Sequence, residues 1–445
     1  MGESSTIYAP ATGAGVAAIA VIRLSGPGAG ATIDALTGGR RPAPRRASLR
    51  RLRDPAGGEV LDSALLLWLP GPASETGEDM AELHLHGGRA VLAGVLDALA
   101  RLPGLRLAEP GEFARRAFEN GRLDLTAAEA VADLVAAETA GQRRQALAQL
   151  DGALATLYDG WRDRLVRLLA HLEADIDFPD EDLPPEAGGA ARGAIAGLAA
   201  DIAAHLADGH RGERLRDGVR IAVIGAPNVG KSSLLNRLAR REAAIVAATA
   251  GTTRDVIEVA LDLGGVKVIL ADTAGLRSAG DPVEVEGIRR AQAAAVAADL
   301  RLAVFDATAW PALDPQTMAL IDATTVPVLN KVDLAAPAAA LIGGQAVSAV
   351  SALTGAGVVA LEARLSEAVA DRFGARESPA LTRARHRAAL EEAEVALRRA
   401  GAAGLSPELV AEDVRLAARS LGRITGRVDV EELLDVIFRD FCIGK

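Results

Sequence analysis

The amino-acid sequence predicts a multidomain protein with mixed α/β and all-α parts, in which an α/β domain is inserted into a discontinuous helical domain. Short apolar runs separated by turn residues precede residue 120, helical periodicity follows, and this periodicity returns after a segment of strands and glycine-rich turns. We place an N-terminal α+β domain at 1–119, the two halves of a helical domain at 120–216 and 376–445, and the α/β domain at 217–375.

Composition limits the classes of protein to which the chain can belong. The 445 residues are 50% hydrophobic and 24% charged, which is typical of a globular protein with two or three domains. A single cysteine excludes an intrachain disulfide and favours a reducing compartment, so we expect a cytoplasmic protein. The apolar run at 16–22 is too short to span a membrane, so no membrane association is expected. The net charge of −10 argues against a nucleic-acid coat protein but allows a local basic groove.

The N-terminal domain is expected to combine strands and helices. The runs "GVAAIAVIRLSG", "SALLLWLP" and "AELHLHGG" predict strands, and "RAVLAGVLDALARL" predicts a helix. His84 and His86 share one strand face, and we favour a packing or polar role because a metal site would need more ligands. The segment at 40–53, "RRPAPRRASLRRLR", contains seven arginines. It could contact RNA phosphates, but a solvated surface is the simpler interpretation in an arginine-biased chain.

The helical domain is recognised by its periodicity on both sides of the α/β domain. It begins in "LDLTAAEAVADLVAAETAGQRRQALAQL" (123–150), where Thr126 is the expected N-cap, and "FPDEDLPP" (178–185) interrupts it. Helices are expected again at 381–400 and 406–425.

Lysine is rare in this chain, with four lysines beside 45 arginines. A GC-rich bacterial genome would replace lysine by arginine wherever the two are interchangeable, so the remaining lysines should lie where a guanidinium cannot substitute. These lysines are Lys231, Lys267, Lys331 and Lys445. Lys445 ends the chain in "FCIGK", together with the single cysteine, Cys442.

A phosphate-binding loop lies in "IAVIGAPNVGKSSLLNRL" (221–238). An apolar strand is followed by Gly225, four residues, and then Gly230, Lys231 and Ser232 at the start of a helix. Backbone N–H groups and the helix N-terminus would hold the phosphates, Lys231 would reach the outer phosphates, and Ser232 would bind Mg²⁺.

Guanine recognition is predicted at the end of a second strand, "VPVLNKVDLA" (326–335). The Asp333 carboxylate can accept hydrogen bonds from guanine N1–H and the 2-amino group, which adenine does not offer together. "VSALTGAG" supplies a second base-contact loop, and "ILADTAGLR" and "AGTTRD" supply the two switches of a Ras-like P-loop GTPase domain. The predicted GTP-binding residues are Asn228, Val229, Gly230, Lys231, Ser232, Ser233, Thr249, Thr252, Thr253, Asp272, Thr273, Ala274, Gly275, Asn330, Lys331, Asp333, Ser351 and Ala352, with Ser232 and Thr253 as Mg²⁺ ligands and Asp272 acting on Mg²⁺ through water.

The usual water-orienting glutamine of Ras-like proteins is replaced by Leu276, which has no polar atom. Two other groups are candidates for this part of hydrolysis. Asn228 could hold a monovalent cation against the phosphates, and either Glu284 or Glu286, shortly after the second switch, could position the water.

The full chain resembles the MnmE (TrmE) family of bacterial tRNA-modification GTPases. The resemblance lies in "TIYAPATGAGVAAIAVIRLSGP", "TGEDMAELHLHGG", "PGEFARRAFENGRLDLTAAEAVADLV", "EADIDFP", "GAPNVGKSSLLNRL", "AGTTRDVIE", "DTAGLR" and the terminal "FCIGK". The GTPase motifs alone would also fit Era- or EngA-like GTPases, which act as switches in ribosome assembly without modification chemistry. The N-terminal block, the divided helical domain and the terminal motif favour the MnmE family.

The resemblance implies a folate-binding-like N-terminal domain that forms a homodimer and binds 5-formyl-tetrahydrofolate or a related one-carbon folate. Motif matching gives Arg23, Glu78, Arg122 and Lys445 as its ligands, with Arg122 in place of the family's common lysine. The family works with an FAD-dependent flavoprotein of the MnmG type, as a heterotetramer, to add an aminomethyl or carboxymethylaminomethyl group at C5 of the wobble uridine of tRNA. The chain lacks a dinucleotide fingerprint, so we expect it to bind no flavin itself.

The resemblance also implies potassium-dependent pairing of two GTPase domains. The ion would be held by Asn228, Ala247, Thr249 and Thr252, the loop members through backbone atoms or a hydroxyl. The family register selects Glu284 over Glu286 as the water-orienting residue. For the C-terminal tail, the alternatives are a frayed end and a tail that the last helix delivers into the folate pocket, with Cys442 beside the one-carbon unit. We favour the second, so Glu284 and Cys442 are the predicted catalytic residues.

Overall fold

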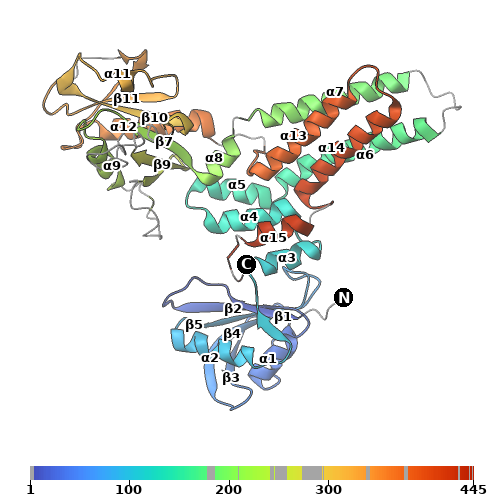
Figure 1. Cartoon of the computed structure of the whole chain (residues 1–445). Coiled ribbons are helices and arrows are strands. Elements are labelled where there is room, and N and C mark those ends of the chain that lie inside the picture. The colour runs from blue at the N-terminus through green and yellow to red at the C-terminus, as the bar shows by residue number, and fades with distance from the viewer. Residues whose placement is uncertain are drawn as a thin grey trace, which may run out of the picture. The chain divides into compact units, whose positions relative to one another are not determined.

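The computed structural model describes residues 5–177, 186–208, 210–240, 245, 258–272, 293, 295–336, 341–374, 379–428, 431–439, 441, 442 and 444. The chain forms two compact units (Figure 1). Unit 1 contains Met1–Val135, Gln149–Ala199 and Glu392–Lys445, and unit 2 contains Ala136–Ala148 and Ala200–Glu391.

The N-terminal part of unit 1 is a six-stranded sheet in the order β3-β4-β5-β2-β1-β6. All neighbouring strands are antiparallel except β1 and β6, which are parallel. The strands are β1 (Thr6–Pro10), β2 (Ile19–Ser25), β3 (Ser48–Arg53), β4 (Val60–Leu69), β5 (Met80–His86) and β6 (Leu105–Leu107). Their side chains alternate between two faces, so the sheet can bury a different set of residues on each.

Helices α1 (Ala29–Thr37) and α2 (Arg89–Ala100) contribute to the core on one face of this sheet (Figure 1). On the other face, Phe113 of α3 (Glu112–Glu119) packs in a smaller cluster with Ile7 and Met80. The expected strands and the helix at 89–102 are therefore present.

The rest of unit 1 is helical. The most extensive packing is between α6 (Ala153–Asp177) and α14 (Pro407–Thr425), which lie on opposite sides of the inserted domain in the sequence. Near the chain end, Phe438 and Phe441 pack with residues of α3 and of the next helix along the chain. The remaining helices of this part of the chain are α4 (Leu125–Ala136), α5 (Ala140–Leu150), α7 (Glu186–Leu206), α13 (Ala384–Ala400) and α15 (Glu431–Arg439). Of these, α5, α7 and α13 have residues in both units, and α4 has its last residue in unit 2.

One detail of the helical prediction is wrong. Thr126 is not the N-cap, because it lies within α4 and is fully buried. The Asp124 carboxylate takes that role, since its Oδ1 accepts hydrogen bonds from the N–H groups of Thr126 at 2.7 Å and Ala127 at 3.1 Å. The stretch 123–150 contains two helices, because α4 ends at Ala136 and α5 begins at Ala140. Thr139 lies just before α5, and its hydroxyl accepts a hydrogen bond from the Gln142 N–H at 3.3 Å.

Unit 2 contains a second six-stranded sheet in the order β14-β11-β10-β7-β9-β8. The pairs are parallel, apart from β8 with β9. Buried aliphatic residues cover both faces, in two separate clusters. The strands are β7 (Val219–Ile224), β8 (Glu258–Leu263), β9 (Val266–Asp272), β10 (Leu300–Asp306), β11 (Thr325–Asn330) and β14 (Ser348–Ala349), beside a hairpin of β12 (Leu341–Ile342) and β13 (Gln345–Ala346).

Four helices and one 3₁₀ turn complete the described part of unit 2 outside α5, α7 and α13. They are α8 (Arg211–Asp217), α9 (Lys231–Ala239), η1 (Ala307–Ala309), α11 (Pro315–Met318) and α12 (Val358–Phe373). In an open parallel sheet, ligands bind beyond the carboxyl ends of the strands. The phosphate loop follows β7, Asp272 ends β9 and Asn330 ends β11, so the predicted site residues gather at that edge.

The predicted fold class is confirmed: an N-terminal α+β domain, a helical domain divided in sequence, and an inserted P-loop α/β domain. The domain boundaries given above stay predictions. No helix within the described residues has both the length and the apolarity needed to cross a bilayer.

Candidate functional site

The loop between β7 and α9 depends on two glycines. Gly225 has φ +150°, and a Cβ there would lie 2.3 Å from the Val304 carbonyl oxygen. Gly230 has φ +96°, and a Cβ there would lie 2.3 Å from Asn330 Nδ2. Any side chain would therefore force the loop away from β10 and β11. Asn228 also lies in the left-handed region, at φ +61°, which asparagine tolerates better than most residues.

Lys231 and Ser232 begin α9 and point back to the loop and to β9. Lys231 is buried, and its Nζ donates hydrogen bonds to the carbonyl oxygens of Gly225 at 2.9 Å and Ala226 at 2.8 Å. Ser232 Oγ donates to Oδ2 of the buried Asp272 at 2.7 Å. A hydroxyl and a carboxylate beside a helix N-terminus are the oxygen ligands and the electrostatic setting that a Mg²⁺–phosphate group requires.

Asn330 connects the phosphate loop to the predicted base-contact loop. Its side chain is buried, with Nδ2 donating to the Val229 carbonyl at 2.8 Å and Oδ1 accepting from the Ala352 N–H at 2.9 Å. Ser351 is fully buried beside it, whereas Asp333 is exposed, as a carboxylate that meets a ligand must be. The side-chain amide of Asn330 therefore connects the phosphate loop with the predicted base-contact loop.

Two polar residues of this site had no sequence signal. Asp306, at the end of β10, accepts a hydrogen bond from Lys331 Nζ at 2.7 Å. Burial alone would raise the pKa of Asp306, but Lys331 and Thr308 hold this pKa below its ordinary value. Arg237 of α9 donates through Nε to the Ala352 carbonyl at 3.1 Å and through Nη2 to the Leu353 carbonyl. Arg237 is one of 45 arginines, so only its position in the fold distinguishes it.

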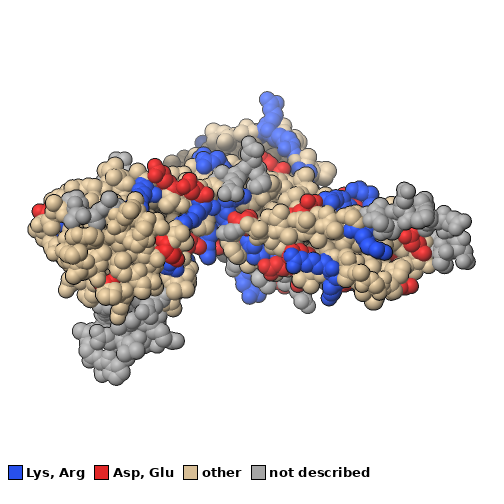
Figure 2. Space-filling model, turned by 90° about the horizontal axis from the view of Figure 1, so that it is seen from above, with Lys and Arg blue, Asp and Glu red and all other residues tan. Residues whose placement is uncertain are grey.

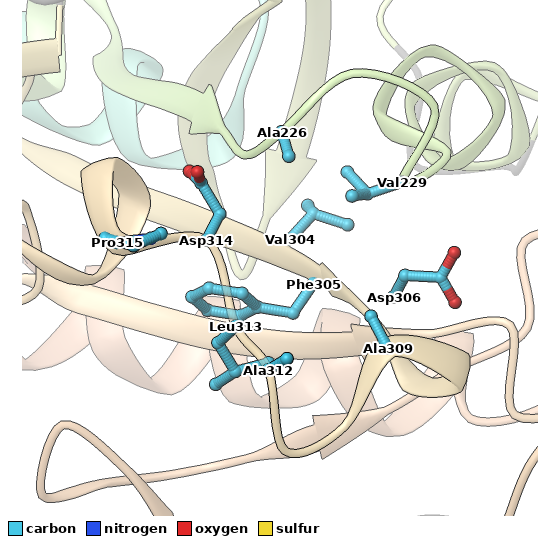
Figure 3. Close-up of a pocket in the computed structure, with 10 residues that line it drawn as sticks. All are labelled: Ala226, Val229, Val304, Phe305, Asp306, Ala309, Ala312, Leu313, Asp314 and Pro315. Carbon is cyan, nitrogen blue, oxygen red and sulfur yellow. The ribbon is translucent and has the colours of Figure 1, made fainter.

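A cavity of about 250 Å³ lies behind the phosphate loop, between that loop and the segment after β10 (Figure 3). Apart from two carboxylates, its lining is apolar, and the carboxylates would repel phosphate groups. Because Val229 is a predicted GTP-binding residue and Asp306 pairs with Lys331, the cavity borders the nucleotide site. Its lining residues are Ala226, Val229, Val304, Phe305, Asp306, Ala309, Ala312, Leu313, Asp314 and Pro315.

Several predicted site residues lie outside the described residues, and their roles stay predictions. They are Ala247, Thr249, Thr252, Thr253, Thr273, Ala274, Gly275, Glu284, Glu286 and Lys445.

A second set of predicted residues lies in the N-terminal domain of unit 1. Arg23 of β2 is buried, pairs with Glu75, and has its guanidinium carbon 5.2 Å from the centroid of the Phe113 ring. Its Nε is buried without a hydrogen-bond partner among the described residues, and the nearest carboxylate oxygen of Glu82 is 3.7 Å away. Burial lowers the pKa of Arg23, and Glu82 opposes this shift.

Glu78 is held by polar groups from two distant segments. Its Oε2 accepts hydrogen bonds from Ser25 Oγ at 2.7 Å and from Arg116 Nη1 at 2.9 Å. Arg116 also donates to Glu112 Oε1 at 3.0 Å and to the Ser5 carbonyl at 2.9 Å, and both Arg116 and Glu112 are buried. Sequence reasoning missed Arg116, because it is one of two adjacent arginines in "EFARRAF" and only the fold shows which one faces inward.

Glu112 is the second carboxylate in this network. It accepts hydrogen bonds from Arg106 Nη1 at 2.8 Å and from the Glu109 N–H at 2.9 Å, in addition to Arg116. Burial alone would raise the pKa of Glu112, but these donors hold the pKa below its ordinary value of 4.5.

The segment that contains Arg122 lies against the turn before Glu78. A Cβ on Gly77 would lie 2.9 Å from Asn120 Cβ and 3.3 Å from Arg122 Cγ, and Asn120 Nδ2 donates to the Thr76 carbonyl at 2.8 Å. Arg122 itself is exposed.

The C-terminal tail lies on the end of β1. A Cβ on Gly444 would lie 2.2 Å from the carbonyl oxygen of Pro10, whose β-sheet partner is Ile22, next to Arg23. Cys442 is exposed, and its carbonyl accepts a hydrogen bond from the Gly111 N–H at 3.4 Å. The tail, Arg23 and Glu78 therefore belong to one region of unit 1. Arg122 lies at the exposed edge of this region.

The two histidines of β5 have carboxylate neighbours. His84 Nε2 lies 3.0 Å from Glu82 Oε2, and His86 Nδ1 lies 2.7 Å from Asp62 Oδ1. These contacts fit the expected polar role.

Comparison with known proteins agrees with this architecture. The family model of the GTP-binding protein TrmE N-terminus matches residues 6–122, and that of the MnmE helical domain matches 125–442. Two proteins named tRNA modification GTPase MnmE are similar over their whole length. The protein from Rhodospirillum rubrum is 61% identical over 99% of both chains, and that from Paramagnetospirillum magneticum is 61% identical over 99% of this chain and 100% of its own. The N-terminal sheet, the phosphate loop and the two halves of the divided helical domain lie within these matches, and the chain belongs to the MnmE family of tRNA modification GTPases.

Proposed function

We propose that this chain acts in the bacterial cytoplasm as a homodimer that, with an FAD-dependent flavoprotein partner, adds a (carboxymethyl)aminomethyl group at C5 of the wobble uridine of tRNA. The full-length similarity to tRNA modification GTPases carries this proposal. GTP hydrolysis by the α/β domain would control the modification step, which belongs to the N-terminal region.

The nucleotide site supports Mg²⁺ and GTP as ligands. Ser232 and Thr253 would hold Mg²⁺, and the pairing of Ser232 with Asp272 supplies the oxygen atoms that this ion prefers. Lys231 would exchange its two carbonyl partners for phosphate oxygens. Asn228, Ala247, Thr249 and Thr252 would hold K⁺, and Glu284 would orient the attacking water in place of the missing glutamine.

The N-terminal region supports an anionic, hydrogen-bonding ligand such as 5-formyl-tetrahydrofolate, with Arg23, Glu78, Arg122 and Lys445 as its ligands. The buried Arg23 Nε without a hydrogen-bond partner among the described residues fits a donor to such a group. When bound, the folate would supply the one-carbon unit. The position of Gly444 against Pro10 brings the end of the chain near Arg23, so Cys442 can act close to that unit.

Profiling of wobble nucleosides in a deletion strain tests the function. We expect the C5 aminomethyl-type nucleoside to disappear and to return with the wild-type gene. Complementation with Cys442→Ser should leave the nucleoside absent or sharply reduced, while the purified variant hydrolyses GTP at the wild-type rate. An unchanged nucleoside profile in the deletion strain would overturn the proposal, and full modification by Cys442→Ser would remove Cys442 from the chemical step.

A further inference from the structure

The arginine-rich segment before and within β3 forms a distinct surface in the N-terminal domain. Half of the fourteen residues at 40–53 are arginine and none is acidic, although the whole chain has a net charge of −10. Six of these arginines, here called the arginine strip, have no carboxylate partner among the described residues. The arginine strip consists of Arg40, Arg45, Arg46, Arg50, Arg51 and Arg53.

The contacts of the strip leave its charge uncompensated. Arg45 donates to the Ala73 carbonyl, Arg50 Nη1 to the Leu49 carbonyl at 2.9 Å, and Arg53 Nη1 to the Gly58 carbonyl at 2.9 Å. Carbonyl oxygens orient a guanidinium without neutralising it. The seventh arginine, Arg41, differs because it pairs with Asp34 and lies over the Trp68 ring.

Two nearby carboxylates are already paired with arginines outside the strip. Asp34 pairs with Arg41, and Asp54 pairs with Arg101 at 2.9 Å. Asp62 is 2.7 Å from a ring nitrogen of His86. Apart from Arg50, which is half-buried, every arginine of the strip is exposed. On the face of the molecule shown in Figure 2, several basic side chains lie beside acidic ones.

Protection of a sheet edge explains only part of this surface. β3 ends the order of its sheet, and charged residues on an edge strand prevent pairing with other chains. One or two charges are enough for that purpose, and Arg40, Arg45 and Arg46 lie before the strand begins. A polyanion approaching a chain with this overall negative charge would be attracted only where positive charge is concentrated.

We propose that the arginine strip is a contact surface for the phosphate backbone of tRNA. This inference rests on the proposed function, because it takes tRNA as the substrate. The strip would position the RNA through charge and not through base recognition, since exposed guanidinium groups on an edge strand contact phosphates without reading sequence.

The test compares two full-length triple variants with equal loss of charge. The first is Arg40→Gln, Arg46→Gln, Arg51→Gln. The control is Arg167→Gln, Arg192→Gln, Arg419→Gln, which replaces exposed arginines on α6, α7 and α14. Binding of an unmodified tRNA transcript is measured by fluorescence anisotropy from 50 to 300 mM KCl, and GTP hydrolysis reports on correct folding.

We expect the strip variant to bind tRNA at least tenfold more weakly than wild type at 100 mM KCl, with GTP hydrolysis unchanged. The slope of log affinity against log salt should fall by about 2, because about 0.7 of a counterion is released per contacted phosphate of a single strand. The control variant should bind as wild type does.

Equal binding by all three proteins, or an equal loss in both variants, would overturn the inference while leaving the proposed function intact. A strip variant that binds tRNA normally but no longer forms the homodimer would also overturn the inference, because the strip would then be a contact surface between two copies of the chain. A wild-type chain that binds no tRNA at any salt concentration would contradict the proposed function as well.

Discussion

Lys231 of the α/β domain and Arg116 of the N-terminal domain are both buried cations, but among the described residues only Arg116 has hydrogen bonds to two carboxylates. Lys231 Nζ bonds to two backbone carbonyls of the loop immediately before it. Arg116 bonds to two carboxylates, Glu78 and Glu112, and to the Ser5 carbonyl far away in sequence. A neutral carbonyl is readily exchanged for a phosphate oxygen, whereas a carboxylate that loses its buried cation is left as an unpaired charge. The first arrangement suits a ligand that comes and goes, and the second suits a permanent scaffold.

Arg116→Ala should have the largest effect on stability. The substitution leaves Glu78 and Glu112 without their common partner and should cost about 3–5 kcal/mol. The neighbouring Arg115→Ala is the control, because Arg115 makes more exposed pairs with Glu119 and Asp435 that are worth about 0–1 kcal/mol. Urea unfolding followed by fluorescence of the buried Trp68, with Trp161→Phe and Trp310→Phe as background, measures both. Similar midpoints for the two variants would show that Arg116 is not the centre of a scaffold.

Lys231→Ala should have the next largest effect, and on turnover instead of stability. Loss of the cation that we predict to bind the outer phosphates should lower GTP turnover about 10²–10³-fold. The matched control is Lys267→Ala in the same unit, because Lys267 pairs with Glu138 away from the phosphate loop. Single-turnover phosphate release compares the two. If the Lys267 variant lost as much turnover, the effect would come from damage to the domain.

Arg237→Ala should weaken guanine-nucleotide binding about tenfold, or ~1.4 kcal/mol, with little change in kcat. Its guanidinium holds two successive carbonyls of the base-contact loop, so the loop should be less well positioned without it. Arg240→Ala, at the exposed end of α9, is the control. Stopped-flow dissociation of a fluorescent GDP provides the measurement, and Arg237→Lys should restore only part of the affinity because a lysine cannot reach both oxygens. A lower kcat at unchanged affinity would contradict a role in positioning the base loop.

Acid should weaken the N-terminal scaffold by the smallest amount of the four. The pKa of Glu112 is lowered in the folded protein, so its contribution to stability is complete above the ordinary value of 4.5 and is lost as pH falls through the lower folded value. The urea midpoint of the Trp68 transition should therefore decrease below about pH 4.5, and Glu112→Gln should make this decrease shallower. An identical pH profile in the Glu112→Gln variant would assign the acid sensitivity to other groups.

The sequence alone determined the functional motifs whose residues are close together along the chain. Three such motifs are short segments: the phosphate loop, the strand end at Asp272, and "NKVD" at the end of another strand. Their local conformations follow from the glycines of the loop, from the start of a helix and from the ends of two strands. The alternation of strands and the helical period likewise predicted the domains and most of the elements. The N-cap of α4 was misplaced by two residues because aspartate and threonine in "DLT" are both N-cap residues, and the geometry of the folded turn selects Asp124.

Only the tertiary structure decided which residues meet across long distances in sequence. Arg115 and Arg116 are indistinguishable in the sequence, yet the rotation of α3 against the sheet leaves Arg115 half-buried and buries Arg116 against Glu78. Arg237 has no special neighbours along the chain, and its role appears where α9 passes the loop after β14. The C-terminal tail reaches β1 because Phe438 and Phe441 pack at the base of the N-terminal domain, close to Gly111, where a side chain would approach within 2.7 Å of the Phe438 carbonyl. Packing of this kind depends on the shapes of surfaces that are far apart in the sequence, and no local pattern encodes it.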